Sequence, residues 1–189
     1  MESLQAYLRE RINLSKADFD LLVDVSVSLN VPAKTRFLEE EKSTDVLYFL
    51  SEGIVRGFKN KDGKLVVEHL VGPNQFITSM ESFFQGLPSV DTFETLSNCL
   101  LVRISRADLE RLKAANPAWN QLIESIISES LQCKMERIHD FQTLTAKERY
   151  VKFVETNPDL ALRVSIENIA SFLGVEPPSL SRIRRQLSF

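Results

Sequence analysis

The chain has 189 residues, of which 43% are hydrophobic and 26% charged, and its formal net charge is -3. This is an ordinary globular composition with ample chain for a buried core, and the acidic balance argues against indiscriminate nucleic-acid binding. No apolar run approaches the ~18 residues that a membrane span needs, and the N-terminus lacks the apolar core of a signal peptide, so we expect a cytoplasmic protein that makes no membrane contact.

The first part of the chain predicts two helices followed by a small β domain. Residues 2–29 carry apolar side chains at helical spacing, and Ser15 can cap the second helix with Asp18 at its third position. After Pro32 come short runs rich in β-branched and aromatic residues, and "NKDGK" between two of them is a good hairpin signal. Short strands at this spacing favour a small antiparallel barrel or sandwich, interrupted by a short helix over residues 79–85.

A long helix follows the strands. Asn116 is a good cap and Pro117 a good first residue, and nothing breaks the helix before about His139 or Gln142. At ~1.5 Å per residue it would be nearly 40 Å long, too long for one small barrel to cover. We therefore expect one apolar stripe to pack on the barrel and another on a partner helix; the alternative is that the barrel covers both. The residues expected at the dimer interface are Ile123, Ile127, Leu131, Met135 and Ile138.

The tail has the pattern of a helix-turn-helix. Ser165 caps a helix that stops at Gly174, and the small Ala170 lets a second helix cross closely. Pro177 and Pro178 can start that second helix, because its first N–H groups need no partner within the helix.

The second tail helix gathers cations at the end of an otherwise acidic chain. From residue 145 onward seven cations stand against five anions, a net charge of +2, whereas the preceding residues have a net charge of -5. Arg182 could pair with guanine O6 and N7 in a major groove, while Arg184 and Arg185 are better placed for phosphates. The alternative is a basic helix on an ordinary helical subdomain. The expected DNA-binding residues are Pro178, Ser179, Ser181, Arg182, Arg184 and Arg185.

These segments together resemble the cyclic-AMP receptor protein / fumarate-nitrate regulator (CRP/FNR) family of bacterial transcription regulators. "TRFLEEEKSTDVLYFLSEGIVRGF" and "DGKLVVEHLVGPNQFI" look like its effector barrel, and "IENIASFLGVEPPSLSRIRRQ" looks like its helix-turn-helix. The resemblance implies an α+β chain: a jelly-roll barrel with N-terminal helices over residues 1–115, a dimerisation helix over 116–142 and a DNA-binding domain over 143–189. It also implies a homodimer that reads a palindromic operator, with RNA polymerase as a candidate further partner.

The effector pocket departs from the family pattern. Members that bind cyclic nucleotides carry Gly-Glu before the pocket helix and Arg-Ser or Arg-Thr after it, whereas this chain has Thr78-Ser79 and Ser89-Val90 at those places. A short neutral serine cannot replace a guanidinium against a phosphate, so we expect cyclic AMP to bind poorly or not at all. The alternatives are a pocket for another small molecule, such as a neutral one, and a core closed by side chains. The expected pocket residues are Phe76, Thr78, Ser79, Ser89 and Val90.

The sequence gives little support for a metal site, a haem site or an enzyme. Cys99 and Cys133 are too few for an iron–sulfur cluster, and we expect both thiols to be reduced, buried and structural. His69 and His139 are expected to be structural or surface residues, not haem ligands, and we expect no metal or cofactor. No nucleophile or phosphate-loop motif supports an enzyme, so no catalytic residue is expected. The family's β-hairpin wing is expected to be absent, because only residues 187–189 follow the second helix. The competing function is an adaptor whose tail binds protein instead of DNA.

Overall fold

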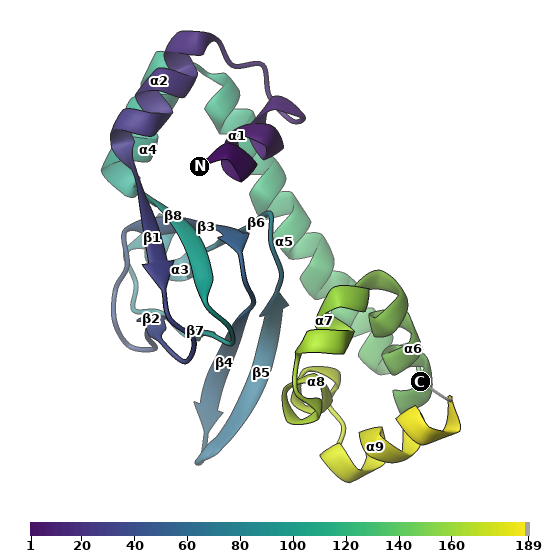
Figure 1. Cartoon of the computed structure of the whole chain (residues 1–189). Coiled ribbons are helices and arrows are strands. Elements are labelled where there is room, and N and C mark those ends of the chain that lie inside the picture. Colours follow the sequence, from purple (N-terminus) through teal and green to yellow (C-terminus); the bar gives the residue numbers. More distant parts are fainter. Residues whose placement is uncertain (188–189) are drawn as a thin grey trace.

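A computed structural model describes residues 1–187: a β sandwich lies beside one long helix, and a C-terminal group of helices gathers around the far end of that helix, next to strands β4 and β5 (Figure 1). The expectation that no wing follows the tail concerns Ser188 and Phe189 and therefore lies outside the described residues. No helix within the described part of the chain is both long and apolar enough to cross a membrane. The helices are α1 (Glu2–Arg9), α2 (Lys16–Val25), α3 (Met80–Gln85), α4 (Arg106–Ala115), α5 (Ala118–Thr143), α6 (Ala146–Thr156), α7 (Pro158–Arg163), α8 (Ile166–Leu173) and α9 (Pro177–Gln186).

In the described part of the chain, eight strands form two four-stranded antiparallel sheets. One sheet has the order β1-β8-β3-β6 and the other β2-β7-β4-β5. The sheets are not joined by hydrogen bonds into a closed barrel, so the predicted barrel is an open, jelly-roll-like sandwich. The strands are β1 (Ser26–Val31), β2 (Arg36–Leu38), β3 (Val46–Glu52), β4 (Val55–Lys61), β5 (Lys64–Val71), β6 (Gln75–Ile77), β7 (Thr92–Thr95) and β8 (Cys99–Ser105).

Helix caps follow the sequence signals closely. The Ser15 hydroxyl accepts the N–H of Asp18, whose carboxylate accepts the N–H of Ser15 in return, so the predicted cap is a full capping box. Asn116 Oδ1 accepts the N–H of Ala118 at 2.9 Å, which is the bond expected of the predicted cap. Helix α5 itself begins at Ala118, one residue later than predicted. The same helix ends at Thr143, close to the predicted end.

Three apolar clusters hold the molecule together. The first lies under α1, α2 and the start of α5, where Trp119 and Leu122 are buried with Phe49. The second fills the space between the two sheets, and the third joins the C-terminal helices to the sandwich through Ile54. Burying a side chain of this size stabilises the fold by roughly 1.5–3 kcal/mol. The first part of α5 is therefore anchored to the sandwich.

Candidate nucleic-acid interface and inner polar cluster

Helices α8 and α9 form the predicted helix-turn-helix. The backbone of Gly174 takes a left-handed conformation, with φ 65° and ψ 38°, which ends α8. The N–H of Val175 donates to the carbonyl of Ala170 at 2.9 Å and closes the turn. Pro177 and Pro178 occupy the first positions of α9, as the sequence predicts, and the chain continues into that helix without a lost hydrogen bond.

The two helices cross over a small buried wedge. Ala170 and Leu180 are fully buried, and Val175 and Ile183 pack against the same cluster as partly buried side chains. The small side chain at position 170 allows the close crossing, and the apolar face of α9 points inward. The opposite face of α9 is consequently turned away from the protein.

The outward face of α9 carries free cations. Pro178, Arg182 and Arg185 are exposed, and Ser179, Ser181 and Arg184 are partly buried. The only polar contact of the Arg182 side chain within residues 1–187 is a long one, 3.4 Å from Nε to the carbonyl of Pro178. Within the same residues none of the three arginines forms an ion pair. These guanidinium groups are therefore available to an external anion.

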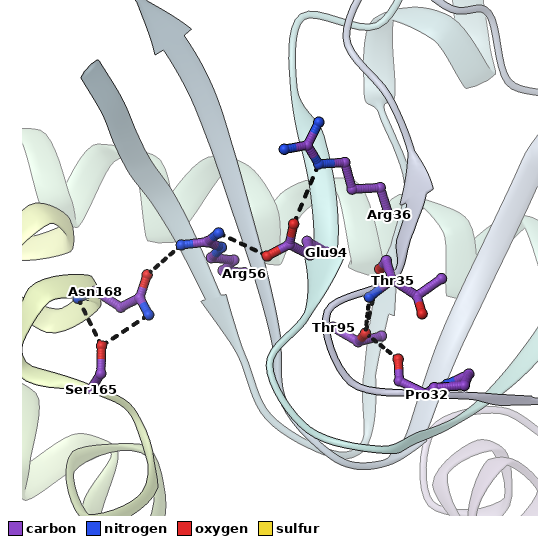
Figure 2. A network of polar contacts seen from close by, with 8 residues as sticks. All are labelled: Pro32, Thr35, Arg36, Arg56, Glu94, Thr95, Ser165 and Asn168. Atoms are coloured by element: carbon purple, nitrogen blue, oxygen red, sulfur yellow. Dashed lines mark hydrogen bonds and ion pairs between the residues drawn. The ribbon is translucent and has the colours of Figure 1, made fainter. Parts of the chain in front are cut away.

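Helix α8 is docked on the edge strand β5. The N–H of Val67 donates to the Ser171 hydroxyl at 2.9 Å, so that an unpaired edge group of the sheet is satisfied by the helix. Arg56 on β4 donates to Asn168 Oδ1 at 2.8 Å and pairs with Glu94 at 2.7 Å (Figure 2). The Arg56–Glu94 pair is largely shielded from solvent, and these bonds hold the helix in one place on the sheet.

Figure 2 shows that this network continues on both sides of Arg56. Asn168 Nδ2 donates to the Ser165 hydroxyl at 3.1 Å, which ties the network to the cap of α8. On the other side Glu94 also accepts from Arg36 Nε at 3.3 Å. The next residue of the same strand, Thr95, accepts the N–H of Thr35 and donates to the carbonyl of Pro32. Glu94 thus lies on a strand that is tied to the Pro32–Thr35 segment by hydrogen bonds.

Arg137 of α5 joins three elements. Its guanidinium donates to the carbonyls of Glu68 at 2.7 Å, Val67 at 3.3 Å and Phe172 at 3.1 Å. It also lies over the ring of Phe172, 4.7 Å from the centroid. Burial lowers the pKa of Arg137 from its usual value. This residue fastens α5, β5 and α8 together, and its sequence context carried no signal of that role.

Part of the predicted dimer interface lies inside the chain. Ile123 is only 6% exposed and belongs to the core under α1 and α2, which the sequence did not place beside it. Ile127 is partly buried against the same core, whereas Leu131, Met135 and Ile138 are 58%, 67% and 55% exposed. The unpartnered stripe of α5 therefore starts near Ile127 and excludes Ile123. Cys133 on the same helix is exposed, so the expectation that both cysteines are buried is wrong for this one.

The residues expected in the pocket have separate roles. Phe76 packs edge-on against Tyr7 and Phe49, toward the N-terminal helices. Thr78 donates to the carbonyl of Val46 at 2.9 Å, and Val90 is exposed. The sequence placed these side chains together because it could not show which face of the loop each would take.

Two further members of this set are buried. The Ser79 hydroxyl is buried without a hydrogen-bond partner among the described residues. The Ser89 hydroxyl donates to the carbonyl of Asp91 at 2.7 Å and accepts its N–H at 3.2 Å. The position at which the resemblance calls for an arginine is therefore a turn whose hydroxyl is already engaged.

A β-bulge gives the inner face of the second sheet a polar cluster that the sequence did not reveal. Gly57 pairs with His69, and the next residue, Phe58, pairs with Val67, so Glu68 is the extra residue of the bulge. Such a bulge redirects side chains, and here Glu68 and His69 turn toward the same region. A Cβ at Gly57 would lie 2.9 Å from His69 and 2.8 Å from Phe93, so glycine allows these two rings to stack across β4.

The ammonium group of Lys59 pairs with both carboxylates of this inner cluster. Lys59 Nζ lies 3.0 Å from Glu68 Oε2 and 3.7 Å from Asp91 Oδ1. Burial raises the pKa of Asp91, and the charge of Lys59 partly opposes this. Burial, and secondly the charge of Lys134, lowers the pKa of His69 to about 4. His69 is therefore a neutral imidazole near pH 7, with a buried carboxylate beside it.

Comparison with known proteins agrees with this architecture. Residues 28–116 match the cyclic nucleotide-binding domain family. The chain is 21% identical over 167 residues to the cAMP-activated global transcriptional regulator CRP of Haemophilus influenzae, covering 82% of this chain and 75% of that protein. The structure of FixK2 from Bradyrhizobium japonicum is similar with a TM-score of 0.77 at 18% identity, over 87% of this chain and 85% of that one. A putative transcriptional regulator of the crp/fnr family from Eubacterium rectale gives a TM-score of 0.71 at 16% identity, over 97% and 88%.

Proposed function

This chain has the fold of the CRP/FNR regulators and carries their cyclic nucleotide-binding domain, and from that premise we propose that it is a dimeric, DNA-binding transcription regulator. The observation that carries the proposal is the outward face of α9, where Arg182 and Arg185 are exposed while the opposite face is buried against α8. An adaptor with a protein-binding tail would be favoured by a tail helix buried in the body. The exposure of these arginines favours the regulator.

We propose that α9 enters the major groove and reads bases. A helix fits the ~12 Å width of that groove, and the residues near its N-terminus reach the base edges. Arg182, with Pro178, Ser179 and Ser181 around it, is placed to pair with guanine O6 and N7. Arg185 and Arg184 lie one turn later and are assigned to phosphates, because cations there neutralise the backbone without reading sequence.

The dimer is proposed to form through α5. Leu131, Met135 and Ile138 recur at intervals of four and three residues and leave an exposed apolar seam, with Ile127 at its start. A symmetric pair of chains would present two copies of α9 to half-sites about 34 Å apart, and the operator would be palindromic. We place this function in the cytoplasm.

Cyclic AMP is a poor fit for the inner cluster around Lys59. The carboxylates of Glu68 and Asp91 face the region, and its lysine, Lys59, is already paired with both. The Ser89 hydroxyl is engaged with its own backbone and offers a cyclic phosphate no charge. We therefore propose that any regulatory ligand is a small species other than cyclic AMP.

Selection of duplexes from a random pool by the purified chain tests this function. The expected product is a palindromic sequence, and binding to it should weaken steeply with salt because phosphate contacts release counterions. Arg182→Ala should lose sequence preference, whereas Arg103→Ala, which removes an exposed arginine from β8, should retain it. A protein that enriches no sequence in dilute buffer, with or without cell metabolites, would refute the proposal.

A further inference from the structure

We infer that Glu68, His69 and Asp91 form a binding site for one divalent first-row transition metal ion on the inner face of the second sheet. Each residue offers one ligand atom, and these atoms lie within 4.8 Å of one another. Metal–ligand bonds of ~2.0–2.2 Å would draw them together by roughly 1 Å, which side-chain rotation supplies. One imidazole and two carboxylates suit Zn²⁺ better than Mg²⁺ or Ca²⁺, because the latter prefer oxygen ligands alone.

The bulge is the feature that makes three ligands from two strands converge. In a regular strand Glu68 and His69 would point to opposite faces, and only one of them could reach Asp91. The register shift at Gly57 and Phe58 turns both toward it. The stacking of His69 on Phe93 then fixes the imidazole ring, so this ligand is oriented before any ion arrives.

Asp91 supplies a second, independent indication of a ligand. This residue is only 7% exposed, and its Oδ1 atom has no hydrogen-bond partner among the described residues. Lys59 is its ion-pair partner, at 3.7 Å, while the two hydrogen bonds of Ser89 hold the backbone of Asp91 in place. A buried carboxylate oxygen without a hydrogen bond is costly unless something else compensates it. A metal ion is suited to that position.

An internal ammonium group competes for the same carboxylates. Lys59 pairs with Glu68 and Asp91, but its side chain is partly exposed and can turn into solvent when an ion binds. Lys134 and Arg137 on α5 also face the cluster, and Glu81 on α3 adds a negative charge. Lys59 therefore sets how tightly the ion binds, and its removal should strengthen binding.

The site lies one residue away from the contacts that hold α8. The N–H of Val67 donates to Ser171 on α8, and the carbonyl of Glu68 accepts from Arg137. An ion that draws Glu68 inward would act on this part of the bulge directly. A regulatory role of the bound ion, acting through α8 on DNA binding, rests on the proposed function. The binding site itself does not.

Calorimetric titration of the full chain with Zn²⁺ tests the site. The background should be Cys133→Ser with His139→Ala, because both side chains are exposed on α5 and can bind Zn²⁺ adventitiously. One equivalent should bind, His69→Gln and Asp91→Asn should each weaken binding at least tenfold, and Lys59→Gln should tighten it several-fold. Circular dichroism checks that each variant is folded. Unchanged binding in both ligand variants, or no binding by either the parent or Lys59→Gln, would overturn the inference.

Spectroscopy and DNA binding complete the test. Co²⁺ in place of Zn²⁺ should give visible absorption bands that disappear with His69→Gln; bands that persist would place the ion elsewhere. Duplex binding is measured separately on metal-free protein. Failure to bind Zn²⁺ with intact duplex binding would refute this inference alone, while Zn²⁺ binding by a chain that ignores every duplex would refute only the proposed function.

Discussion

Replacing Leu131 with glutamate tests the proposed dimer seam. Leu131 is 58% exposed in the single chain, and complete burial of a leucine side chain is worth roughly 1.5–3 kcal/mol. Covering the exposed fraction therefore contributes about 1–1.7 kcal/mol per copy and about 2–3.5 kcal/mol per dimer. Two carboxylates brought together near the symmetry axis add repulsion. Leu131→Glu should thus weaken dimerisation by about 3 kcal/mol or more, roughly 100-fold.

Sedimentation equilibrium over a range of protein concentrations measures this change. The matched control is Leu162→Glu, which makes the same substitution at an 85% exposed leucine on α7, away from the seam. The control should keep the parent mass, and Leu131→Glu should shift to the monomer. If both variants remain dimeric at micromolar concentration, or if the parent is already a monomer, α5 is not the interface.

Three other outcomes are expected. Arg182→Ala should lose ~1–3 kcal/mol of discrimination at one base pair with a smaller loss on random duplex, measured by fluorescence anisotropy; equal losses on both would contradict base reading. Gly174→Ala and Gly86→Ala each place alanine at positive φ, which costs about 1 kcal/mol of stability. Of these two, only the Cβ at position 174 would also meet a side chain, Phe141 at 2.5 Å, so the melting temperature of Gly174→Ala should fall further than that of Gly86→Ala. The pKa of His69 is about 4 in the folded chain and 6.5 ordinarily, so between these pH values the unfolded chain binds more protons than the folded one. The free energy of unfolding is therefore unaffected by protonation of His69 above about pH 6.5, and about 2 kcal/mol of it is lost by pH 5. Urea unfolding should show this loss in the parent and a flatter profile in His69→Gln, and identical profiles would contradict a buried neutral imidazole.

The helix-turn-helix could be predicted from sequence because its signals are local. A left-handed residue at Gly174, two prolines at a helix start and a serine cap each act within a few residues, and the structure shows all of them. The outward direction of Arg182 follows from helical spacing once Leu180 is placed inside. The fold class was accessible for the same reason, since strand runs and turn signals alternate along the β domain.

Long-range placement could not be predicted in this way. Ile123 has the spacing of the α5 seam, but α1 and α2 return from the far end of the sequence to cover it. The inner cluster depends on a one-residue register shift and on Gly57, and neither produces a periodic pattern in the sequence. Pocket residues such as Phe76 were assigned by alignment to a family cassette, and an aromatic partner from α1 decided its orientation instead.

The joint between the tail and the sandwich has its buried polar bonds on α8, through Ser171 and Asn168, and a more exposed ion pair joins Lys64 to Glu176 just before α9. Within residues 1–187 the arginines of α9 take no part in it. Helix α8 therefore provides most of the attachment to the sandwich, and the outer side of α9 is left free of it. Under the proposed function, substitutions along the outer side of α9 would change the duplex that is chosen without disturbing the attachment of α8 to the sandwich. On the same premise, a duplicated gene would acquire a new set of DNA targets through changes on α9 alone and would keep the sandwich, with whatever it binds, unchanged.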